Sequence, residues 1–62
     1  MTVYVVRAEP WEGGWELHVD GLGVTQSHTL ATAENQARDY IETVTGVDLR
    51  EDAVTIVPHR TG

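Results

Sequence analysis

The sequence predicts an α+β fold in which one helix packs on a four-stranded, mostly antiparallel sheet. Residues 15–20, WELHVD, alternate between apolar and polar side chains, which is typical of a strand with one buried face. Residues 30–45 instead repeat their apolar side chains at the spacing of one helix face. With β-branched segments on either side, the order of elements is β-β-β-α-β, and we expect residues 1–62 to form a single domain.

The first three strands are predicted to form a meander. Residues 2–8, TVYVVRA, are rich in β-branched and aromatic side chains, which favours a strand. Residues 9–14, EPWEGG, are expected to form a turn, because the proline lacks a backbone donor and the glycines allow positive φ. Residues 21–23, GLG, reverse the chain again and lead into a polar third strand at 24–28, which we place at an edge.

The helix is expected to run from about residue 30 to residue 45. Thr29 is the predicted N-cap, with Thr32 as the competing choice, because a threonine hydroxyl can accept a free N–H of the first turn. Gly46 follows the last apolar position and suits the left-handed residue that ends many helices. The expected apolar stripe consists of Leu30, Ala33, Ala37, Tyr40, Ile41 and Val44.

Residues 53–57, AVTIV, are predicted to form the fourth strand, which Pro58 ends. A helix between two strands of one sheet normally makes a right-handed crossover to a parallel strand. We therefore expect the fourth strand beside the first, in the strand order 3-2-1-4. One side of the sheet is then left without a helix.

Strand one carries aliphatic side chains on both of its sides, so one set faces away from the helix in either register. A domain of 62 residues has a small core, and the sequence holds no cysteine that could form a disulfide. We therefore expect a homodimer or a larger assembly, in preference to the scattered surface valines that soluble proteins also carry. The candidate interface residues are Val3, Tyr4, Val5 and Val6.

The chain is strongly acidic, with ten Asp and Glu residues, four arginines and a net charge of −6. A phosphate backbone needs a cationic surface, so we expect no nucleic-acid partner, and an RNA-binding domain is a remote alternative. No apolar run approaches the roughly 20 residues that cross a bilayer, and the N-terminus lacks the organisation of a signal peptide. We therefore expect a cytoplasmic protein that does not bind membranes.

The sequence predicts no catalytic, metal or cofactor site. Glu16, His18 and Asp20 share one side of a strand, but a metal ion needs further ligands that no His or Cys cluster provides. We interpret these three residues as a solvated polar face. The glycines at 21–23 lack the third glycine and the following helix of a dinucleotide motif. The protein is therefore not expected to be an enzyme.

Residues 13–41 resemble the N-terminal domain of HicB-type antitoxins, and the order of elements agrees over nearly the whole chain. In that family a glycine-bearing turn leads to an aromatic-containing strand, a Leu-Gly…Val-Thr-Gln turn and strand, and a capped helix with alanines four residues apart. The matching positions are Gly14, Trp15, Leu22, Gly23, Val24, Thr25, Gln26, Thr29, Ala33, Ala37 and Ile41. The resemblance implies a partial ribonuclease-H-like fold without catalytic carboxylates.

The resemblance also implies a function, which is to bind and neutralise a small basic ribonuclease toxin. The family's C-terminal DNA-binding segment has no counterpart in this sequence, so operator binding is not implied. The alternative is an orphan self-associating module that has no toxin partner. Candidate contacts for a partner lie on one strand face and on the polar helix face: Glu16, His18, Asp20, Glu34, Arg38, Asp39 and Glu42.

Overall fold

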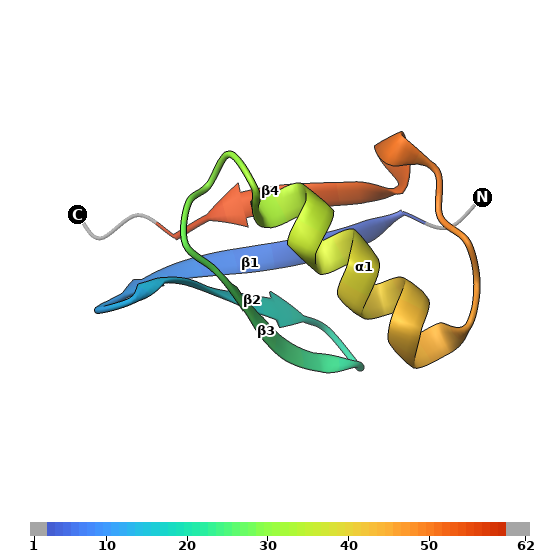
Figure 1. Cartoon of the computed structure of the whole chain (residues 1–62), viewed down its shortest axis with the longest axis horizontal. Helices are drawn as coiled ribbons and strands as arrows, with labels where there is room; N and C mark the ends of the chain where they lie inside the picture. The colour runs from blue at the N-terminus through green and yellow to red at the C-terminus, as the bar shows by residue number, and fades with distance from the viewer. Residues whose placement is uncertain (1–2, 60–62) are drawn as a thin grey trace.

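A computed structural model describes residues 3–59, without the side chain of Glu51. Four strands form one sheet in the order β3-β2-β1-β4, and one helix lies across a single side of it (Figure 1). The predicted α+β fold and strand order are therefore confirmed. The elements are β1 (Tyr4–Trp11), β2 (Gly14–Val19), β3 (Gly23–Ser27), α1 (Ala33–Thr45), the short 3-10 helix η1 (Glu51–Ala53) and β4 (Val54–Pro58).

Strand β1 is central in the sheet, because it pairs antiparallel with β2 and parallel with β4. Strand β3 pairs only with β2 and forms one edge of the sheet, as its polar sequence predicts. Helix α1 connects β3 with β4 and contacts β2, β3 and β4. The fourth strand thus lies parallel to the first and next to it, as expected.

The core lies between α1 and the side of the sheet that the helix covers. Its largest fully buried side chains are Val6, Leu17 and Ile41. Val6 and Ala8 of β1 point toward the helix, so the alternating positions Val5 and Arg7 belong to the opposite side. The buried core cluster consists of Val6, Ala8, Leu17, Val19, Ala33, Ala37, Ile41 and Val54.

The helix begins later than predicted, at Ala33, and the competing choice, Thr32, occupies the N-cap position without forming the expected side-chain capping hydrogen bond. Thr29 does use its hydroxyl as a cap, but for the preceding turn: Thr29 Oγ1 accepts the backbone N–H of Thr32 at 3.2 Å. The expected apolar stripe is also shorter at both of its ends. Leu30 precedes the helix and is 39% exposed, and Val44 in the last turn is 49% exposed.

Strand β1 is longer than predicted and continues through Pro10 to Trp11, so the expected turn at 9–14 shrinks to its last residues. A proline is tolerated in a strand where no ladder partner needs its missing N–H. The ladder between β1 and β4 ends at the pair Ala8 and Pro58, so Pro10 has a neighbouring strand on one side only. The longer strand adds Glu9 to the regular alternation of β1.

Two glycines join the helix to its surroundings. Gly46 adopts φ +74° and donates its N–H to the Glu42 carbonyl at 2.8 Å, so it ends α1 as predicted. Gly23 adopts φ +137° directly beneath the hydroxyl of Tyr40. That hydroxyl donates to the Leu22 carbonyl at 3.1 Å, which fixes α1 to the turn between β2 and β3.

Candidate functional site

The candidate site is the side of the sheet that α1 leaves uncovered, which we call the open face. Its residues alternate with the buried ones along each strand, and the pairing register places them in rows across the sheet. Four of the residues on or beside it are valines that keep about half of their surface exposed. The open face consists of Val3, Val5, Arg7, Glu9 and Trp11 from β1 and the residue before it, Glu16 and His18 from β2, Val24 and Gln26 from β3, and Thr55 and Val57 from β4.

A cluster of one imidazole and two carboxylates lies at the centre of the open face. Glu9 and Glu16 are direct partners across β1 and β2, and His18 lies next to both of them. His18 Nε2 is 3.1 Å from Glu9 Oε2 and 3.4 Å from Glu16 Oε1. Neither contact has hydrogen-bond angles, so each is an ion pair only when the imidazole carries protons on both of its nitrogens.

Arg7 lies beside this cluster, opposite His18 in the register of β1 and β2. It borders an open hollow of about 730 Å³ at the turn between β2 and β3. Apolar side chains form much of the wall of the hollow, from Val5, Leu22 and Val24. An exposed guanidinium in such surroundings can hold a carboxylate through paired hydrogen bonds.

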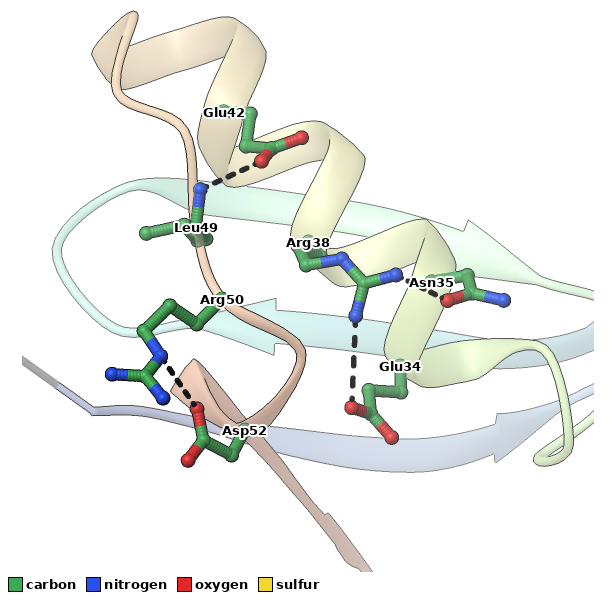
Figure 2. A network of polar contacts seen from close by, with 7 residues as sticks. All are labelled: Glu34, Asn35, Arg38, Glu42, Leu49, Arg50 and Asp52. Atoms are coloured by element: carbon green, nitrogen blue, oxygen red, sulfur yellow. Dashed lines mark hydrogen bonds and ion pairs between the residues drawn. The ribbon is translucent and has the colours of Figure 1, made fainter.

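Among the described residues, Arg7 differs from the other arginines in its charge partners. Arg38 lies 3.7 Å from a carboxylate oxygen of Glu34, and Arg50 lies 3.7 Å from one of Asp52 (Figure 2). No described carboxylate lies within ion-pair distance of Arg7. The open face therefore contains the described arginine that forms no ion pair with a described carboxylate, in a chain whose net charge is −6.

The polar face of α1, which the sequence analysis named as a second candidate contact, is largely occupied by contacts within the chain. Arg38 donates to Asn35 Oδ1 at 2.6 Å in addition to its ion pair with Glu34. Glu42 Oε2 accepts the backbone N–H of Leu49 at 2.7 Å and so holds the link to β4 against the helix (Figure 2). Asp39 stays exposed. These contacts favour a structural role for most of this face.

The structure separates the four candidate interface residues into two pairs. Val3 and Val5 lie on the open side and are 52% and 56% exposed. Val6 is completely buried under α1, and Tyr4 packs against the core from the same side. The inclusion of Val6 and Tyr4 was wrong, because the sequence does not show which side of strand one meets the helix.

The three polar candidates of strand two are not brought together as a group. Glu16 and His18 lie side by side on the open face, whereas Asp20 belongs to the exposed turn that follows β2. Sequence reasoning missed Glu9, which completes the cluster, because Pro10 was taken to end the strand. The alternation of Val5, Arg7 and Glu9 was the available signal. Within residues 3–59, no group of His, Cys, Asp or Glu side chains could hold a metal ion.

A second hollow, of about 460 Å³, lies at the end of the sheet beside the loop that leads into α1. Trp11 borders it, together with His28 and the amide side chains of Gln26 and Gln36. The indole of Trp11 lies directly against Gly13, where any side chain would collide with the ring. This packing fixes Trp11 at the end of β1, with 43% of its surface exposed.

Comparison with known proteins gives one informative similarity. The chain is 33% identical over 55 residues to "Membrane protein NfeD2" of Bacillus subtilis (strain 168), a match that covers 89% of this chain. The match covers 32% of that relative, so the chain spans about a third of its length. No family model matches the chain, and no solved structure matches it. Within the described residues 3–59, no helix is long and apolar enough to cross a bilayer.

These comparisons overturn three of the expectations from the sequence. The resemblance to HicB-type antitoxins is wrong, since the relative is named as a membrane protein and no family model matches. The toxin-neutralising function that depended on it is wrong with it. The expected cytoplasmic location is contradicted by the same relative.

The structure explains why the antitoxin motif was misleading. Gly23, Ala33 and Ala37 match it because they form a tight turn and the buried side of a helix. Thr29 matches it without being the N-cap of α1. Such positions indicate a β-turn-β-helix arrangement, which unrelated proteins share. They do not indicate a particular function.

Proposed function

We propose that this chain is a non-catalytic self-association domain, in which the open face of the sheet binds the open face of a second copy. The observation that supports the proposal is the exposure of valines on or beside this face. Val5 is 56% exposed, Val24 is 49% exposed and Val57 is 45% exposed, on three different strands. Apolar side chains gathered on an uncovered sheet face are typical of an interaction surface.

The small size of the domain supports the same proposal. The core is formed on one side of the sheet only, between α1 and side chains such as Val6 and Leu17. A chain of this length buries only about 60% of the surface that it exposes when unfolded, so its own core leaves a narrow margin of stability. Covering the open face with a second copy would add a second apolar layer to the same sheet.

The charges on the open face favour a second copy of the chain as the partner. A cationic partner would meet the carboxylates Glu9 and Glu16, but it would also meet Arg7 in the same patch. A surface that carries both signs in neighbouring rows is best matched by a surface with the same two rows in reverse order. The second copy of this chain has such a surface. Two expectations from the sequence remain predictions: the chain is not an enzyme, and it binds no nucleic acid.

The similarity to a membrane protein favours a place for this domain in an assembly at a membrane. Direct binding to lipid is opposed by the net charge of −6, because anionic lipid surfaces attract basic segments and repel acidic ones. We therefore expect the purified chain to stay unbound in a flotation assay with anionic vesicles. Co-flotation would contradict this expectation and would indicate a lipid-binding surface.

Sedimentation equilibrium over a wide range of concentrations tests the self-association. We expect reversible dimers for the wild type, and a melting temperature that rises with concentration because folding and association are linked. Val5→Asp should weaken the dimer strongly, since it places a charge in the middle of the buried patch. Val47→Asp is the matched control: Val47 is also 56% exposed, but it lies in the link after α1. A monomer at every concentration, with a constant melting temperature, would refute the proposal.

A further inference from the structure

The residues that β1 contributes to the open side are complementary to themselves when their order is reversed. By the alternation of the strand, these residues are Val5, Arg7, Glu9 and Trp11: apolar, basic, acidic and apolar. A second copy of β1 that runs in the opposite direction presents an apolar, acidic, basic and apolar series. Each charge would then face an opposite charge, and each apolar side chain would face another.

The same pattern continues onto β2. Arg7 is paired with His18, and Glu9 is paired with Glu16, in the register of the two strands. The open face therefore has a basic row, Arg7 and His18, next to an acidic row, Glu9 and Glu16. The two rows are about 7 Å apart, the distance between alternate residues of a strand.

Contacts within one copy leave both rows incompletely neutralised. Glu9 and Glu16 are like charges directly opposite each other, an arrangement that is destabilising unless a cation lies nearby. They share the single imidazole of His18. Arg7, in the neighbouring row, has no carboxylate partner among the described residues. A single copy thus has surplus negative charge in one row, and in the other row an arginine with no described carboxylate within ion-pair distance.

From this pattern, and on the basis of the proposed self-association, we infer that two copies pack face to face about a two-fold axis that passes over Ala8 of β1, midway between the two sheets. The axis is parallel to the sheet and perpendicular to the strand. Arg7 then faces Glu9 of the second copy, and His18 faces Glu16 of the second copy. Val5 faces Trp11 of the second copy. Each contact occurs twice, as in any interface with two-fold symmetry.

The dimensions of the molecule allow such an interface. Its two longer dimensions, 34 and 21 Å, correspond to a projected area of about 700 Å² per copy. Stable interfaces commonly bury roughly 800 Å² per partner, so this one belongs at the small end of the range. We expect a dimer of moderate affinity, which a change of one charge shifts by a measurable amount.

Two charge reversals test this arrangement: Arg7→Glu, which makes both rows of β1 acidic, and Glu9→Arg, which makes both basic. Each variant alone should self-associate at least ~10-fold more weakly than the wild type, because like charges face each other twice. An equimolar mixture of the two should form heterodimers with about the wild-type affinity, since the two acidic positions of one β1 meet the two basic positions of the other. Native mass spectrometry separates these species by mass, and circular dichroism confirms that each variant is folded.

The control is a mixture of Arg7→Glu with Asp39→Arg, a reversal of the same size at an exposed position on α1. We expect no preferential heterodimer in this mixture. If Val5→Asp disrupts the dimer while Arg7→Glu and Glu9→Arg keep the wild-type affinity, the open face is the interface and the inferred axis is wrong. A wild-type chain that never dimerises would instead overturn the proposed function itself.

Discussion

Replacing Ile41 by alanine tests which side chains of α1 stabilise the fold. Ile41 is completely buried, and its helical neighbours on the same face, Ala33 and Ala37, are too small to fill the space that it would leave. Removing a buried isoleucine side chain down to Cβ typically costs about 2–5 kcal/mol. The better helix propensity of alanine offsets roughly 0.5 kcal/mol of that loss at most. We expect Ile41→Ala to lower the free energy of unfolding by about 3 kcal/mol.

This loss is large in relation to the stability that a chain of 62 residues can have. At ~0.05–0.15 kcal/mol per residue, the whole domain is stable by roughly 3–9 kcal/mol. Urea denaturation of Ile41→Ala should therefore show a midpoint reduced by about a third or more, or a chain that is unfolded without urea. The free energy of unfolding of Ile41→Val should lie between those of Ile41→Ala and the wild type, with a loss of about 1 kcal/mol.

Val44→Ala is the matched control for this experiment. The sequence pattern places Val44 in the same stripe as Ile41, but in the structure it is 49% exposed. Its replacement should change the free energy of unfolding by less than ~0.5 kcal/mol. All variants are compared at one low protein concentration, since association would add stability. Equal losses for Ile41→Ala and Val44→Ala would refute the assignment of the buried helix face.

Substitutions at three further positions test how α1 is anchored. Tyr40→Phe removes the hydroxyl that donates to the Leu22 carbonyl. Urea denaturation should show a free energy of unfolding that is lower by about 0.5–1.5 kcal/mol. No change would show that this hydrogen bond is not formed. Gly46→Ala should cost about 1 kcal/mol by thermal melting because φ is +74°, and Gly46→Asn should cost less. Glu42→Gln keeps an acceptor for the Leu49 N–H, whereas Glu42→Ala removes it. Hydrogen exchange at the Leu49 amide should therefore be faster in Glu42→Ala than in Glu42→Gln. Equal exchange rates in the two variants would contradict the contact.

The elements were predictable because each has a clear local signal, and the strand order followed from the right-handed crossover through the helix. The alternation of WELHVD defines β2, and the helical spacing of Ala33, Ala37 and Ile41 defines α1. The start of the helix was not predictable in the same way. Thr29 and Thr32 are both good caps, and the choice depends on where the chain leaves β3, which is a tertiary feature.

Only part of the candidate site could be found from the sequence. Glu16 and His18 were identified because they alternate with buried residues in β2. Glu9 was missed because Pro10 normally ends a strand, and the exception depends on β4 ending at the level of Ala8. The sequence also could not show that Arg7 has no ion-pair partner among the described carboxylates. That difference is visible only once the carboxylate partners of Arg38 and Arg50 are known.

The acidity of the chain does not prevent two copies from meeting at the open face. The net charge of −6 repels a second copy at long range, but physiological salt screens exposed charges beyond about 8 Å. Charges that touch across an interface lie within that distance and are partly removed from water, so they are screened less. Whether two acidic copies bind is therefore decided by the register in which Arg7 meets a carboxylate. A register centred on Glu9 instead places the carboxylates of Glu9 and Glu16 against those of the second copy, and this repulsion disfavours it.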